Sequence, residues 1–163
     1  MTDVAALLAL ARARGVRIAT AESCTGGMIS AALTDVAGSS DVFDRGFVTY
    51  SNDAKIAMLG IRPATLQAVG AVSEAIAAEM ALGAVSRSAA ALAVSVTGIA
   101  GPGGSEFKPE GRVCFGIATG SSVQTETVEF GAIGRAQVRK ATVDHALHLL
   151  HRALLASPPL ERA

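Results

Sequence analysis

The segment AALAVSVTG (90–98) constrains the fold more than any other part of this 163-residue chain. It is a continuous apolar run, whereas a strand with one face in water alternates apolar and polar residues. Continuous runs are typical of strands buried on both faces, which need helices on both sides of their sheet. We therefore expect an α/β fold, a three-layer α/β/α sandwich with a mixed central sheet.

The other segments alternate between helical and strand patterns, which supports this interpretation. Thr2 or Asp3 and Ser73 are the expected helix caps. Helices are expected at about 3–14, 28–36, 53–61, 63–70, 73–89 and 135–156. Further strands are expected at 16–22, 44–52, 112–120 and 123–130, the last two as an antiparallel hairpin. We expect one domain over 1–163, with its core at about 5–155 and a tail at 157–163.

The composition argues against several classes of function. Only 17% of the residues are charged and the formal net charge is zero, so a nucleic-acid partner is not expected. No apolar run reaches the roughly 20 residues of a membrane span, and the N-terminus lacks the features of a signal peptide. Cys24 and Cys114 are far apart and form no metal-binding motif. We expect a cytoplasmic protein with no membrane partner, metal or other cofactor.

The segment SCTGG (23–27) separates the first strand from the helix that follows. Ser23, Cys24 and Thr25 carry nucleophilic or capping atoms, and the two glycines allow close approach of a backbone. Free N–H groups at a helix start can hold a phosphate or a developing oxyanion. The alternative is structural, because a serine or threonine here commonly caps the helix.

A second glycine-rich loop, TGIAGPGG (97–104), follows the buried strand. It lacks the Gly-Lys-Ser/Thr of a P-loop. In open α/β sheets ligands bind where strands end and helices begin. If the two strands are parallel, both glycine-rich loops emerge at one edge and predict a shared site.

A third polar group, Tyr50, Ser51 and Lys55, lies at the next strand-to-helix junction. A lysine buried in a cleft has a lowered pKa and can serve as a general base. A Ser–Lys pair is one variant of the serine–base arrangement. At the surface the same lysine would be a solvated charge.

The histidines and arginines give weaker indications. His145, His148 and His151 all fall in the last helix, without an acidic or Cys ligand nearby, so solvent or interface positions are expected. Arg135 and Arg139 are four residues apart, so they share a helix face. The alternatives are a pair that binds a phosphate and a pair that is solvated.

Four blocks together closely resemble the C-terminal domain of the CinA (competence/damage-inducible) family, over about residues 5 to 155. They are AESCTGGMISAALTDVAGSS (21–40), FDRGFVTYSNDAK (43–55), GAVSEAIAAEMALGA (70–84) and VSVTGIAGPGGSEFKPEGRVCFGIA (94–118). The resemblance implies hydrolysis of nicotinamide mononucleotide to nicotinate mononucleotide and ammonia, in pyridine nucleotide (NAD) recycling. It also implies a three-layer domain, usually a homo-oligomer, that needs no metal.

The resemblance suggests a role for each group. Ser23 is the expected nucleophile and Lys55 the base and then the proton donor to ammonia. Tyr50 or Ser51 would relay the proton or orient the pair. N–H groups around 25–27 or around 98–101 would bind the oxyanion. The phosphate would bind the other loop or Arg135 and Arg139, and the nicotinamide ring would pack on Phe43, Phe47 or Tyr50. The expected substrate-binding residues are Thr25, Gly26, Gly27, Ser39, Ser40, Phe43, Ser51, Thr97, Gly98, Ile99, Ala100, Gly101 and Arg139.

Several alternatives stay open at this point. Ser39 and Ser40 are rival nucleophiles, and Cys24 is a weaker one because a cysteine nucleophile needs a nearby His or cation. The glycine-rich loops are also compatible with a non-catalytic nucleotide-binding regulatory module, and the Ala-rich helices with an assembly role. The Ser/Lys/Tyr set favours an enzyme, because binding alone does not need it.

Overall fold

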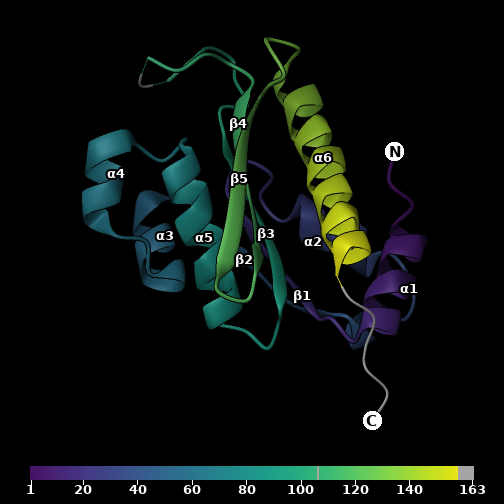
Figure 1. Cartoon of the computed structure of the whole chain (residues 1–163). Coiled ribbons are helices and arrows are strands. Elements are labelled where there is room, and N and C mark those ends of the chain that lie inside the picture. The colour runs from purple at the N-terminus through teal and green to yellow at the C-terminus, as the bar shows by residue number, and fades with distance from the viewer. Residues whose placement is uncertain (106, 158–163) are drawn as a thin grey trace.

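The computed structural model describes residues 1–105 and 107–157 and contains one five-stranded mixed sheet (Figure 1). The strands are β1 (Ile18–Glu22), β2 (Phe43–Val48), β3 (Leu92–Gly98), β4 (Arg112–Thr119) and β5 (Ser122–Glu129). Their order is β2-β1-β3-β4-β5, and β1 is parallel to both of its neighbours. β3, β4 and β5 pair antiparallel. The predicted mixed sheet and hairpin are therefore confirmed.

Helices cover both faces of the sheet, as the three-layer prediction requires (Figure 1). α1 (Val4–Arg14), α2 (Met28–Thr34) and α6 (Arg135–Ala156) pack on one face. α3 (Asn52–Leu59), α4 (Pro63–Val69) and α5 (Glu74–Ser86) pack on the other. A short 3-10 helix, η1 (Ser39–Asp41), precedes β2. Among the described residues, no helix is long and apolar enough to cross a membrane.

The buried strand β3 divides its side chains between the two layers. Leu92, Val94 and Val96 join the core beneath α1, α2 and α6, and Ala93 joins the core beneath α5. α5 lies very close to the sheet, because a Cβ on Gly116 would meet a backbone oxygen of that helix at 2.5 Å. The small residues that dominate the composition therefore set the distance between helix and sheet.

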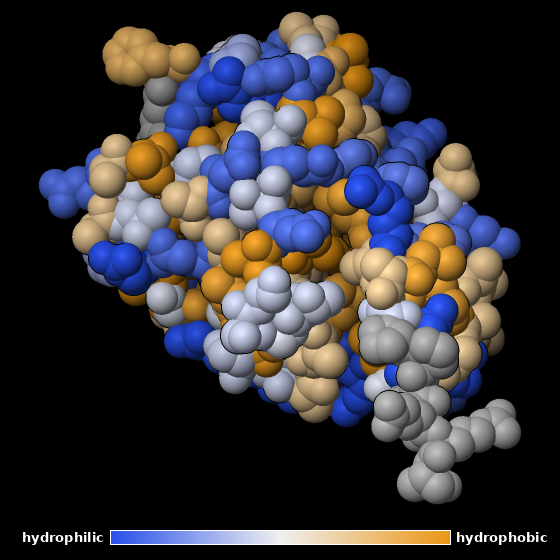
Figure 2. Space-filling view, in the orientation of Figure 1, coloured by the Kyte–Doolittle hydropathy of each residue, from blue (hydrophilic) through white to orange (hydrophobic). Residues whose placement is uncertain are grey.

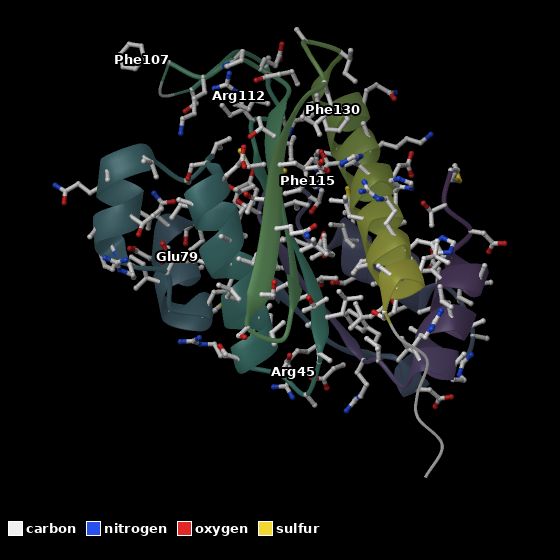
Figure 3. All side chains as sticks on the ribbon, in the orientation of Figure 1. Arg45, Glu79, Phe107, Arg112, Phe115 and Phe130 are labelled. Atoms are coloured by element: carbon white, nitrogen blue, oxygen red, sulfur yellow. The ribbon has the colours of Figure 1, made fainter. Side chains whose placement is uncertain are left out.

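Larger side chains fill the other layer. Phe115 and Phe130 lie between the sheet and α6, edge to face, with ring centroids 6.4 Å apart (Figure 3). Figure 2 views the molecule from the side of β5, between the two helical layers, and hydrophobic residues are visible toward the middle of that surface among hydrophilic ones. The core around Phe115 and Phe130 holds α6 against the sheet. It therefore fixes the position of Arg135 and Arg139 near the start of that helix.

The expected helix ends are largely confirmed. Asp3 caps α1 by accepting from the N–H of Ala6 at 3.1 Å, and Ser73 caps α5. The strand expected at 44–52 ends earlier, at Val48, because Ser51 turns to cap α3 instead. The helix expected at 73–89 ends at Ser86. Beyond Ser157, the expected tail lies outside the described residues.

The sheet has two distinct ends, which Arg112 and Arg45 mark in Figure 3. Glu22 of β1 pairs with Val96 of β3, so both strands finish at the Arg112 end. The two glycine-rich loops follow these strands. The prediction that they emerge side by side is therefore confirmed.

Candidate active site

Ser23 and Lys55 lie in contact at the carboxyl end of β1. The N–H of Ser23 donates to the carbonyl of Val96 at 3.1 Å, so the sheet fixes the backbone of this serine. Lys55 lies in the first turn of α3, which begins where the hydroxyl of Ser51 accepts from the N–H of Ala54 at 3.0 Å. The Lys55 Nζ lies 3.0 Å from the Ser23 Oγ.

The surroundings of Lys55 direct its lone pair at Ser23. The Nζ donates to the carbonyl of Thr49 at 3.0 Å and lies 3.5 Å from the carbonyl of Tyr50. A neutral amine has two N–H groups and one lone pair. Because the two carbonyls accept the two N–H groups, the lone pair faces Ser23 Oγ and accepts its proton. The protonated amine instead donates to all three oxygens.

Burial lowers the pKa of Lys55 below its ordinary value of 10.5. The side chain is 1% exposed, and among the described residues no carboxylate pairs with it. An ammonium removed from water without a counter-ion loses stability relative to the neutral amine. Lys55 therefore has both the position and the chemistry of a general base.

Glu22, directly before Ser23, is a fully buried carboxylate that sequence reasoning missed. One oxygen accepts from the Thr25 hydroxyl at 2.6 Å and the N–H of Ile29 at 2.8 Å. The other accepts from the N–H of Ser30 at 3.0 Å and its hydroxyl at 2.9 Å. Four donors offset the cost of burying the charge. The available signal was an acid at the end of an apolar strand, since buried acids are rare unless paired.

These contacts correct two predictions about the segment 23–27. Neither Ser23 nor Thr25 caps α2; its cap residue is Gly27, and the Glu22 side chain satisfies the first amides of the helix instead. The same amides are then occupied, so the start of α2 is not a free phosphate site. Gly26 and Gly27 have positive φ angles of 58° and 106°, which side chains rarely adopt.

A cleft of about 450 Å³ lies along the second glycine-rich loop. Ser23 and Lys55 do not line it themselves; Tyr50, whose carbonyl lies 3.5 Å from the Lys55 Nζ, is the lining residue that connects the cleft to this pair. The predicted residues Gly98, Ile99, Ala100 and Gly101 line it. Thr97 does not; its hydroxyl donates to the carbonyl of Ala71 at 2.8 Å. The other lining residues are Tyr50, Asn52, Ala71, Val72, Pro102, Gly103, Gly104, Ser105, Lys108 and Arg135.

Two cations face this cleft. The Lys108 Nζ donates to the carbonyls of Val69 at 2.7 Å and Val72 at 2.6 Å. Its third N–H has no acceptor among residues 1–105 and 107–157. Arg135 donates to the carbonyl of Gly101 at 2.8 Å and to the hydroxyl of Tyr50 at 2.9 Å. Lys108 was not foreseen from the sequence, because a lone lysine in a glycine-rich loop resembles a solvated one.

Tyr50, Ser51 and Arg139 have other contacts than those predicted. No relay is needed, because Ser23 and Lys55 touch directly; the Tyr50 hydroxyl binds Arg135, and Ser51 caps α3. Arg139 donates to the carbonyls of Cys24 at 3.1 Å and Thr25 at 3.3 Å. It therefore braces the loop 23–27, while Arg135 lines the cleft.

The predicted substrate-binding residues Ser39, Ser40 and Phe43 do not lie near Ser23 within this chain. Ser39 and Ser40 lie in η1, and Phe43 pairs with Ile18 at the start of β1. Parallel strands put these residues at the opposite end of the sheet from Ser23. Phe47 packs into the core beneath α5 instead of the cleft.

The structure does not favour Cys24 as a nucleophile or the histidines as metal ligands. Cys24 is buried, and burial raises its pKa to about 12, so its thiol stays protonated. Contrary to the expectation that no acidic side chain lies near the histidines, the His145 Nε2 lies 2.5 Å from the carboxylate of Glu126. The His145 ring also packs against Phe115, with centroids 4.6 Å apart. Within 1–105 and 107–157, no group of three or more His, Cys, Asp or Glu side chains is arranged to hold a metal ion.

The fold and the site define an α/β protein in which a buried lysine faces a serine beside a cleft. The chain belongs to the CinA C-terminal domain family, whose model matches residues 2–154. It is 49% identical over 145 residues to the nicotinamide-nucleotide amidohydrolase PncC of Escherichia coli (strain K12), covering 88% of each chain. It is 53% identical over 145 residues to a CinA-like protein of Chlorobium phaeobacteroides (strain BS1), of which it spans 34% while 86% of this chain is covered.

Solved structures agree with this assignment. The competence/damage inducible protein CihA of Agrobacterium tumefaciens has a TM-score of 0.86 and 48% identity, over 95% of this chain and 97% of that one. The competence damage-inducible protein A of Klebsiella pneumoniae subsp. pneumoniae has a TM-score of 0.90 and 36% identity, over 96% and 100%. The chain spans about a third of the length of the longer CinA-like proteins that it matches.

Proposed function

We propose that this chain hydrolyses nicotinamide mononucleotide to nicotinate mononucleotide and ammonia, with Ser23 as nucleophile and Lys55 as base. The observation that carries the proposal is the 3.0 Å contact between Ser23 Oγ and a buried Lys55 Nζ. The 49% identity to an amidohydrolase of nicotinamide nucleotides supports the substrate class.

The reaction follows from the protonation states of the pair. Lys55 takes the proton of Ser23 as Oγ attacks the carboxamide carbon, which gives a tetrahedral oxyanion. The resulting ammonium gives its proton to the departing nitrogen, so ammonia leaves and an ester to Ser23 remains. Lys55, neutral again, takes a proton from water as that water attacks the ester, and then gives it to Ser23 Oγ as the bond from carbon to Oγ breaks. The carboxylic acid that forms releases its remaining proton to solvent and becomes the carboxylate.

The oxyanion has a donor in the loop directly after Ser23. The N–H groups of Thr25 and Gly27 donate to no other described residue, whereas those of Gly26 and Met28 donate to carbonyls within the loop. Free, fixed N–H groups beside a nucleophile stabilise charge as it develops. The N–H of Cys24 also has no acceptor among the described residues, but Cys24 and Thr25 are buried whereas Gly27 is partly exposed. We assign the N–H of Gly27 as the oxyanion donor.

The phosphate then belongs to the other side of the cleft. The Glu22 carboxylate occupies the first amides of α2 and would repel a second anion there. Lys108 and Arg135 line the cleft, and each has N–H groups beyond those that donate to other described residues. We assign the 5′-phosphate to these two cations, and the nicotinamide end of the substrate to the side of Ser23.

Location and assembly are further parts of the proposal. We place the protein in the cytoplasm as a homo-oligomer, and we retain the competence/damage-inducible association of the family. The support is the composition, together with the family match.

A panel of nicotinamide compounds tests the function. Ammonia release is measured with nicotinamide mononucleotide, nicotinamide riboside and nicotinamide, with and without a chelator. The proposal expects release mainly from the nucleotide and no effect of the chelator. Tight binding of a nucleotide that stays unchanged would support a regulatory binding module instead, and chelator-sensitive release would contradict the serine–lysine chemistry.

A further inference from the structure

Glu22 connects the two parts of the candidate site. Its side chain reaches forward to Thr25, Ile29 and Ser30, across the loop that holds Ser23. Its carbonyl accepts from the N–H of Thr49 at 2.9 Å. The carbonyl of Thr49 in turn holds the Lys55 Nζ. One residue therefore contacts both the nucleophile loop and the segment that carries the base.

The carboxylate replaces a cap that α2 lacks. The cap residue Gly27 has no side chain, so the N–H groups of Ile29 and Ser30 depend on Glu22 for an acceptor. A buried amide without an acceptor is costly, so loss of the carboxylate would shift the start of α2. Such a shift moves Cys24 to Gly27, because this loop joins Ser23 to the helix without a residue to spare.

The hydroxyl contacts add a second constraint. Thr25 is fully buried and its hydroxyl donates to Glu22, while its carbonyl accepts from Arg139. The Ser30 hydroxyl donates to Glu22 and therefore accepts from the hydroxyl of Thr20 at 2.7 Å. Hydroxyls from β1, the loop 23–27 and α2 thus surround the Glu22 carboxylate and fix the position of the loop relative to the helix.

We propose that Glu22 is a positioning residue for the hydrolysis, whose buried carboxylate holds the loop 24–27 in the conformation that the reaction at Ser23 requires. Glu22 is fully buried and acts through the loop 24–27, whose Gly27 amide is the assigned oxyanion donor. The inference rests on the proposed function, in that Ser23 is the nucleophile. It goes further than the proposed function, because it states that the Glu22 carboxylate sets the conformation of the loop that carries the oxyanion donor.

Replacement of Glu22 by Gln tests this without removing volume. The substitution turns one carboxylate oxygen into an NH2 group. In either orientation this group faces a backbone N–H, that of Ile29 or that of Ser30. Both groups are donors, so that hydrogen bond is lost. The loop must then shift. We expect kcat to fall by about 10–100-fold, the range for a displacement of about 1 Å in an active site, with KM close to wild type.

Two controls separate positioning from general destabilisation. Leu154→Ala truncates a buried side chain near the far end of α6 and lowers the melting temperature without touching the site. Glu74→Gln changes a carboxylate that accepts from the hydroxyls of Thr125 and Thr127. A hydroxyl can also accept from an NH2 group, so these hydrogen bonds survive the substitution. Both controls should keep wild-type kcat at a temperature where all variants are folded. If Glu22→Gln loses no more kcat than Leu154→Ala at a matched loss of melting temperature, the inference is wrong.

A second pair of variants covers the case in which Glu22→Gln does not fold. Thr25→Val removes only the hydroxyl that donates to Glu22, and Thr25→Ser keeps it. We expect Thr25→Val to lower kcat and Thr25→Ser to restore most of it. Equal kcat for wild type, Thr25→Val and Thr25→Ser would overturn the inference.

A measurement without the nucleotide distinguishes this inference from the proposed function. A fluorophosphonate forms a bond from its phosphorus to Ser23 Oγ and releases fluoride, while Lys55 takes the serine proton. The rate of this labelling, followed by mass spectrometry, should fall in Glu22→Gln and not in Glu74→Gln. A wild-type chain that labels but does not deamidate contradicts the substrate alone; equal labelling of wild type and Glu22→Gln overturns the positioning role, and a wild-type chain that neither labels nor deamidates overturns both.

Discussion

Ser23 and Lys55 are 32 residues apart in the chain, and their side-chain atoms Oγ and Nζ are 3.0 Å apart in the fold. The contact exists because β1 and β2 are parallel neighbours, so the residues that follow each strand meet at one edge of the sheet. Two backbone carbonyls, from Thr49 and Tyr50, orient the amine toward the hydroxyl. Carbonyls orient the amine without adding a charge that would keep it protonated.

The lowered pKa of Lys55 predicts how the activity depends on pH. Only the neutral amine accepts the serine proton, so kcat/KM should rise with pH until the pKa of Lys55 is passed, and then level off. Because burial lowers this pKa, the inflection should lie below 10.5. The measurement is kcat/KM for nicotinamide mononucleotide across the neutral and alkaline range. A rate that falls with rising pH, or an inflection at or above 10.5, would be inconsistent with this prediction.

The same pKa shift predicts a change in stability. Between the lowered pKa in the folded chain and the ordinary 10.5 of the unfolded chain, the unfolded state binds more protons. The free energy of unfolding should therefore rise with pH in this window. Urea unfolding of wild type and Lys55→Met across that range provides the test, and the variant should show a smaller rise. Identical pH dependence in both proteins would argue against a depressed pKa.

Cys24 should be inert although it is adjacent to the nucleophile. Its side chain is 5% exposed and burial raises its pKa to about 12, so very little thiolate is present near neutral pH. Iodoacetamide should leave the native protein unmodified and react with both cysteines after denaturation, as judged by intact mass. Cys24→Ala should keep kcat near wild type. Rapid native alkylation at Cys24 with matching loss of activity would restore the cysteine as a rival nucleophile.

Thr49 carries a buried hydroxyl that finds no hydrogen-bond partner among the described residues. A buried polar atom without a partner costs stability, so an apolar side chain of the same shape should be neutral or favourable. We expect Thr49→Val to keep kcat and to raise the free energy of unfolding by up to about 1 kcal/mol. Thr49→Ala is the matched control, because it removes the methyl group as well as the hydroxyl. Loss of activity in Thr49→Val alone would show that the hydroxyl has a role in the reaction.

Lys108 and Arg135 should determine the preference for a phosphorylated substrate. Lys108→Ala and Arg135→Ala are each expected to raise KM for nicotinamide mononucleotide by about 10-fold or more, the loss of one charge-assisted hydrogen bond. The slower reaction with nicotinamide riboside should be unchanged, because it has no phosphate. Lys140→Ala, an exposed lysine of α6, serves as control. Equal losses for nucleotide and riboside would place the phosphate elsewhere.

Local patterns in the sequence predicted most of the fold. Asp3 and Ser73 were recognisable caps because side chains of this kind accept from amides three residues later. The buried strand 92–98 was recognisable because it has no polar alternation. The end of β2 was misjudged by several residues, since Thr49 and Tyr50 look like strand residues but their carbonyls serve Lys55 instead.

The site was less predictable, because its contacts join distant segments. Ser23 and Lys55 were each recognisable by type, but their contact depends on strand order. Ser39 and Ser40 have the same chemistry as Ser23 and differ only in the end of the sheet at which they lie. Glu22 was overlooked because its partners, Thr25, Ile29 and Ser30, are visible only once α2 has been placed.

The most direct test of the Ser23–Lys55 assignment is ammonia release from nicotinamide mononucleotide by wild type, Ser23→Ala and Lys55→Met, with Lys140→Met as control. Met fills the space of the buried lysine and leaves no charge. Wild type and Lys140→Met should release ammonia at the same rate. Both site variants should stay folded by circular dichroism. Lys55→Met should lose about 10²–10⁴-fold in kcat/KM, the contribution of a positioned general base, and Ser23→Ala, which lacks the nucleophile, should lose at least as much. Full activity in either Ser23→Ala or Lys55→Met would contradict the assignment.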